Sequence, residues 1–89
     1  MDQSTKDTLK FCIEFVKNNF REHSQVSMCL VWIKQATDIL DKATEVSSAG
    51  FISNELSSVE KYLTGSNSSS TYEDIISKIQ MIETLMQDI

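Results

Sequence analysis

Few side chains in this sequence have the chemistry that catalysis requires. His23 is the only histidine, and Cys12 and Cys29 are the only cysteines. The sequence contains no GxSxG or HExxH pattern and no glycine-rich phosphate loop. His23 lies in a polar stretch between two apolar segments, which is typical of a solvated connection. We therefore expect no enzyme activity and no catalytic residue.

A metal site would have to use the same few residues. Four-coordinate zinc would need Cys12, Cys29 and His23 together with a carboxylate, and no CxxC or HxxxH pair brings two ligands together. Both cysteines fall on apolar helix faces, which predicts two reduced, buried thiols. A disulfide between neighbouring helices stays open as an alternative. We expect no metal and no cofactor.

The charge balance limits the kinds of partner. Thirteen acidic residues against eight basic ones give a net charge of -5, which repels phosphate backbones and anionic lipid surfaces. The longest fully apolar run, residues 28–33, is far shorter than the roughly 20 residues of a membrane-spanning helix. The first ten residues carry charges and do not resemble a secretory signal. We expect a cytoplasmic protein that binds neither nucleic acid nor membranes and has no evident small-molecule substrate.

Four amphipathic segments would position these residues. Their apolar residues recur at alternating steps of three and four, the spacing of one helix face, and the longest such segment is central in the chain. Shared spacing and short connections favour side-by-side packing, so we predict an all-α fold, a small antiparallel four-helix bundle in a single domain over 1–89. Residues 65–70 are rich in serine and predict a flexible loop. The predicted helices span about residues 5–21, 24–48, 54–64 and 71–88.

The polar stretch between the first two segments also changes the phase of the apolar stripe. A break near residues 21–24 returns both stripes to one core, with Ser24 as the cap of the second helix. The competing interpretation is one long helix over residues 5–47, which would bury Asn18 and Glu22.

The other helix ends are predicted from their capping residues. Ser4 or Thr5 can cap the first helix, and Gly50 predicts a left-handed residue that closes the second, with Phe51 in contact with Val46. The remaining signals are Ser53 as cap of the third helix, Gly65 as its end, and a Ser70–Glu73 capping box for the fourth.

Two aromatic residues of the first helix lie away from its apolar stripe. Phe11 and Phe15 are spaced i,i+4 on a different face from the stripe that runs from Leu9 to Phe20. We predict that they belong to a partner-binding surface, extended by Val31 and Met81. The alternative is that they pack between two neighbouring helices. Trp32 is interpreted as a core residue.

The function expected from these features is that of a non-enzymatic protein–protein interaction module, a subunit or an adaptor, which presents an apolar helix face. The partner would be another protein or a second copy of the chain. The alternative is an acidic inhibitor or immunity-type protein that blocks a basic site. Ser70 and Thr71 each precede an acidic residue by three positions, which predicts possible phosphorylation sites.

Overall fold

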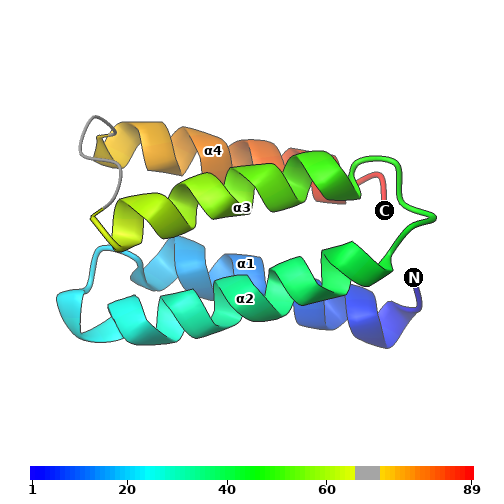
Figure 1. The fold of residues 1–89 in the computed structure, drawn as a ribbon, viewed down its shortest axis with the longest axis horizontal. Coiled ribbons are helices and arrows are strands. Elements are labelled where there is room, and N and C mark those ends of the chain that lie inside the picture. Colours follow the sequence, from blue (N-terminus) through cyan, green and yellow to red (C-terminus); the bar gives the residue numbers. More distant parts are fainter. Residues whose placement is uncertain (66–70) are drawn as a thin grey trace.

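Helices make up about 80% of the described residues in this computed structural model, which covers residues 1–65 and 71–89. Within those residues there is no strand, and the predicted all-α, antiparallel four-helix bundle is confirmed (Figure 1). A short 3-10 turn, His23–Gln25, precedes the second helix. The helices are α1 (Gln3–Asn19), α2 (Val26–Lys42), α3 (Ala49–Leu63) and α4 (Tyr72–Met86).

Each helix packs beside its neighbour in the chain, and α4 closes the bundle against α1. The α1–α2 and α2–α3 pairs make the most extensive contacts, and α1 and α4 the sparsest. Both termini and the α2–α3 connection lie at one end of the bundle, whereas the α1–α2 connection lies at the other (Figure 1). Among the neighbouring helix pairs, α1 and α4 therefore make the fewest contacts.

The core is formed by the three–four stripes that the sequence predicts. Every buried residue in the described part is apolar, and no buried side-chain polar atom there lacks a hydrogen-bond partner. A closed apolar core with no polar group to satisfy is the simplest way for a chain of this length to stabilise one fold. Its members are Leu9, Cys12, Ile13, Val16, Phe20, Cys29, Ile33, Ala36, Leu40, Ala49, Ile52, Leu56, Val59, Ile75, Ile79 and Ile82.

The break between α1 and α2 is confirmed, and the single helix over residues 5–47 is wrong. Phe20 ends α1 with its ring stacked on Tyr72, at 5.1 Å between centroids, and the Arg21 guanidinium lies 4.1 Å from the centre of the Tyr72 ring. The prediction that Ser24 caps α2 is wrong, because Ser24 lies inside the 3-10 turn. That turn continues into α2 through a hydrogen bond from the Val26 amide to the His23 carbonyl, so no side-chain cap is needed.

The first helix begins earlier than predicted, and its cap is Asp2 rather than Ser4 or Thr5. The Asp2 carboxylate accepts a hydrogen bond of 2.8 Å from the Thr5 amide. Hydrogen bonds from Thr5 lower the pKa of Asp2 below its ordinary value. A charged acceptor also suits the positive end of the helix dipole, which explains why the aspartate is preferred over the hydroxyl residues.

The predicted connection between the second and third helices is wrong. α2 ends at Lys42 rather than near residue 48, and α3 already begins at Ala49, so Gly50 and Ser53 lie inside α3. Gly50 has no positive φ, and Phe51 is 51% exposed instead of closing the end of α2.

The chain reverses through successive tight turns that the sequence pattern does not reveal. The amides of Ala43, Val46 and Ala49 each donate to the carbonyl three residues earlier. An early start of α3 places Ala49 three residues before Ile52, on the buried face of the same helix. Burial of Ala49 therefore favours this start over one at residue 54.

The far end of α3 is confirmed, and the start of α4 is shifted by one residue. Gly65 has φ 79°, the left-handed conformation that glycine adopts without strain, and its amide donates to the Tyr62 carbonyl. The capping box consists of Thr71 and Asp74, with hydrogen bonds of 3.2 and 3.0 Å, and not of Ser70 and Glu73. Ser70 and the rest of the predicted loop after Gly65 lie outside the described residues.

Leu40 tests the core. It is 3% exposed on the central stripe of α2, so Leu40→Ala should lower the free energy of unfolding by roughly 2 to 5 kcal/mol in urea denaturation. Val31→Ala on the same helix is the control, because Val31 is 55% exposed and should change stability by less than about 0.5 kcal/mol. Equal losses for both variants would show that the stripe is not the core.

Thr71 tests the capping box. Thr71→Ala removes the acceptor of the Asp74 amide and should lower the free energy of unfolding by about 1 kcal/mol, measured by thermal or urea denaturation. Thr71→Ser keeps the hydroxyl and should retain most of this stability. A serine variant as unstable as the alanine variant would assign the effect to the lost methyl group instead of the cap.

Candidate interaction surface

Three aromatic side chains meet on the outside of the α1–α2 pair. Phe11 and Phe15 project from α1 one turn apart, and Trp32 projects from α2 toward both. The Phe11 and Trp32 rings pack edge to face at 5.1 Å, and the Phe15 and Trp32 centroids are 6.2 Å apart. The antiparallel arrangement of α1 and α2 brings these residues together from positions far apart in the sequence.

The three rings differ in how much of each is exposed. Phe15 and Trp32 are partly buried and pack against the core, whereas Phe11 is 51% exposed. The interpretation of Trp32 as a core residue is therefore correct only in part, because its ring packs against the core and also reaches the surface. The cluster is an outward continuation of the core, and its outermost ring lies in solvent.

Two exposed residues of α2 extend this cluster. Met28 lies one turn before Trp32, and Val31 lies about 100° further around the outer side of α2, with exposures of 43% and 55%. We refer to Phe11, Phe15, Met28, Val31 and Trp32 together as the α1–α2 face. The sequence prediction named Phe11, Phe15 and Val31 but not Met28, and it interpreted Trp32 as a core residue. The i,i+4 spacing of Met28 and Trp32, which matches that of Phe11 and Phe15, was the available signal.

Met81, the other residue predicted for this surface, lies elsewhere. It projects from α4 one turn beyond Lys78, whose ammonium pairs with Glu55 of α3. Phe51 lies one turn before Glu55 on α3, so helix register places both exposed residues toward the outer side of the α3–α4 pair. The structure does not bring Met81 together with Phe11.

Carboxylates border the α1–α2 face along α1. Asp7 and Glu14 are seven residues apart, so they lie on one side of the helix, beside Phe11. Neither forms an ion pair in residues 1–65 and 71–89, and Asp7 accepts a hydrogen bond only from the neutral Gln3 amide. The ion pairs that do form there join Met1 to Glu45 at 2.8 Å, Lys17 to Glu83 at 3.1 Å and Lys78 to Glu55 at 3.4 Å.

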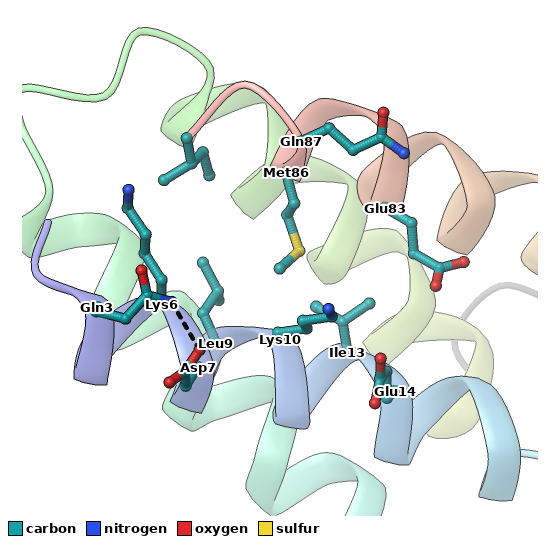
Figure 2. Close-up of a pocket in the computed structure, with 11 residues that line it drawn as sticks. Gln3, Lys6, Asp7, Leu9, Lys10, Ile13, Glu14, Glu83, Met86 and Gln87 are labelled. Carbon is teal, nitrogen blue, oxygen red and sulfur yellow. Dashed lines mark hydrogen bonds between the residues drawn. The ribbon is translucent and has the colours of Figure 1, made fainter.

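A cleft of about 310 Å³ opens along the seam between α1 and α4 (Figure 2). Met86 reaches from α4 between Leu9 and Ile13, which form the apolar floor. Among the described residues that line the cleft there is no histidine, cysteine or serine. The charged lining residues are Lys6, Asp7, Lys10, Glu14 and Glu83.

The residues with intrinsic reactivity do not converge on a site. His23 is exposed in the 3-10 turn, and Cys12 and Cys29 are unpaired and fully buried. Burial raises the pKa of both thiols above the ordinary value, which makes the reactive thiolate scarce. The described residues contain no group of three or more potential metal ligands.

The predicted phosphorylation sites lie at the start of α4. Thr71 is exposed, and its hydroxyl accepts a hydrogen bond from the Asp74 amide. Ser70 lies outside the described residues. A phosphate on Thr71 would add about two negative charges at a helix N-terminus. Phosphorylation of Ser70 and Thr71 stays a prediction.

No family model, curated protein or solved structure matches this chain. Within residues 1–65 and 71–89, no helix combines the length and the apolar character that crossing a bilayer requires.

The cysteines provide a test of the closed core. Because Cys12 and Cys29 are buried and their pKa values are raised, neither native thiol should react with a disulfide reagent faster than the protein unfolds. Both should react at once in guanidinium. Rapid labelling of one thiol in the native protein would place that cysteine at the surface and contradict the packing of α1 against α2.

Proposed function

We propose that this protein is a non-enzymatic interaction module that binds another protein through the α1–α2 face. The observation that carries the proposal is the ring cluster of Phe11, Phe15 and Trp32, in which Phe11 is half exposed, with the exposed Met28 and Val31 on the same stretch of α2 as Trp32. Aromatic residues fixed by packing on one side and open to solvent on the other are the kind that dominate binding energy at protein interfaces. A subunit or an adaptor would use such a face.

The face is also prepared for binding before a partner arrives. Phe15 and Trp32 are held against the core, and Phe11 is held by the Trp32 ring at 5.1 Å. Side chains that are already ordered lose little conformational entropy on association. The two unpaired thiols suit a reducing compartment such as the cytoplasm, where a disulfide between them would not form.

An acidic inhibitor that blocks a basic site is the second candidate. The net charge is -5, and only three of the thirteen carboxylate side chains form ion pairs in the described part of the chain. Ionic strength separates the two functions, because binding by the acidic surface should weaken steeply from low to high salt, whereas docking of the apolar face should change little.

Serine substitutions on two faces test the proposal. Phe11→Ser with Val31→Ser removes two exposed side chains of the α1–α2 face and leaves Phe15 and Trp32 packed against the core. The helical circular dichroism signal should stay nearly unchanged, while co-purification of the partner from the native cell, or the apparent mass of a self-associated form, should be lost.

The matched control is Phe51→Ser with Met81→Ser. These residues are 51% and 48% exposed, close to the 51% of Phe11 and the 55% of Val31, but they lie on α3 and α4. The control should keep its partner. If both double variants retain association, or both lose it, the α1–α2 face is not the binding surface.

A further inference from the structure

The α1–α2 face has the form of two parallel apolar rows. Phe11 and Phe15 form one row and Met28 and Trp32 the other, each at i,i+4 spacing on antiparallel helices. Rows of this spacing are the ridges against which a further helix packs its own side chains. The amides and carbonyls in the middle of α1 and α2 are bonded within each helix, so the face cannot bind a strand by backbone pairing. Its form therefore suits a helical occupant.

The charges at the border of the face indicate which charges that occupant would carry. Asp7 and Glu14 are about 10 Å apart along α1 at a rise of 1.5 Å per residue, and neither has a cationic partner in the described chain. Figure 2 shows both carboxylates directed away from Met86, whereas the Lys6 side chain extends along the cleft. Lys10 lies between them in the sequence but one step further around α1 toward α4, so the row next to Phe11 is acidic and Lys10 flanks it. The border along α2 is not acidic, because Lys34 and Lys42 lie on either side of Asp38 there.

We propose that the α1–α2 face binds an amphipathic helix of a partner protein that carries two basic residues about seven positions apart along one edge of its apolar stripe. The apolar stripe covers the two rows, and the basic edge lies over Asp7 and Glu14. A spacing of i,i+7 returns to the same side of a helix after two turns and matches the spacing of these carboxylates. This inference rests on the proposed function and names the partner element. A second copy is disfavoured because each chain carries a net charge of -5.

Trp32 supplies the measurement, because it is the only tryptophan and lies in the face. The probes are three synthetic helical peptides of about 18 residues with a leucine stripe and no tryptophan. They are identical except at two edge positions seven apart, which carry arginine, glutamine or glutamate. Titration of the full chain, followed by Trp32 emission at low salt, gives three dissociation constants.

We expect the arginine peptide to bind most tightly and the glutamate peptide most weakly, with about two- to tenfold between successive peptides. Asp7→Asn with Glu14→Gln should remove most of this difference while leaving the glutamine peptide bound as before. Asp41→Asn with Glu60→Gln is the matched control, because it removes the same net charge from exposed positions on α2 and α3 and should retain the preference.

Each other outcome overturns the inference in a recognisable way. Equal binding of all three peptides, or a preference that survives in the Asp7 and Glu14 variant, would contradict the inferred basic edge of the partner helix. Neither result would contradict the proposed function. If no peptide changes Trp32 emission and the chain sediments as a dimer that Phe11→Ser with Val31→Ser dissociates, the occupant is a second copy. If no peptide binds and the chain is a monomer, no amphipathic helix of this type is the occupant. The proposed function is then decided separately by the two serine variants.

Discussion

The arrangement of the protein depends on one requirement, that the apolar stripes of α1 and α2 face the same core. A continuous helix through residues 20–25 would turn the Cys29 side away from the Leu9 side, because the two stripes are out of phase. The break at Phe20 and the 3-10 turn restore the phase, and Phe20 is held there by stacking on Tyr72. The same break makes α1 and α2 antiparallel. Phe11 and Phe15 meet Trp32 only because of that reversal, so the candidate surface follows from the condition that forms the core.

Sequence patterns predicted most of the buried stripes and missed most of the helix ends, with the Gly65 end of α3 as the exception. The predicted core positions between Leu9 and Leu40 were correct, because each apolar stripe is repeated over several helical turns. A single misplaced residue therefore cannot change the phase of the stripe. Helix ends depend on single groups that differ by about 1 kcal/mol or less, so Thr71–Asp74 and Ser70–Glu73 are nearly equivalent as patterns. The candidate site was predicted in part, since Phe11 and Phe15 are visibly off the stripe. The separation of Met81 from them depends on which side of α4 faces α3, and this is fixed only by three-dimensional packing.

The α1–α2 face combines stability and recognition in neighbouring side chains. Phe15 and Trp32 bury one side against the core, and Phe11 and Val31 contribute mainly to the exposed area. A chain of this length has a stability on the order of 5 kcal/mol, so loss of a partly buried ring removes a large fraction of it. Substitutions at Phe15 or Trp32 therefore affect folding and binding together. Phe11 and Val31 are the positions at which the two effects separate.

The position of the face within the bundle also matters for how it binds. α4 is joined to its neighbours by the Lys17–Glu83 and Lys78–Glu55 pairs, which are partly exposed and contribute at most about 1 kcal/mol each, so its buried isoleucines hold it in place. Its seam with α1 is the sparsest in the bundle and contains the cleft. The α1–α2 face lies over one of the most closely packed pairs. The aromatic rows of the α1–α2 face do not line the α1–α4 cleft, whereas Asp7 and Glu14 do, so opening of that seam would leave the rows intact. Binding energy at the face is then available for affinity and is not consumed in reshaping the bundle.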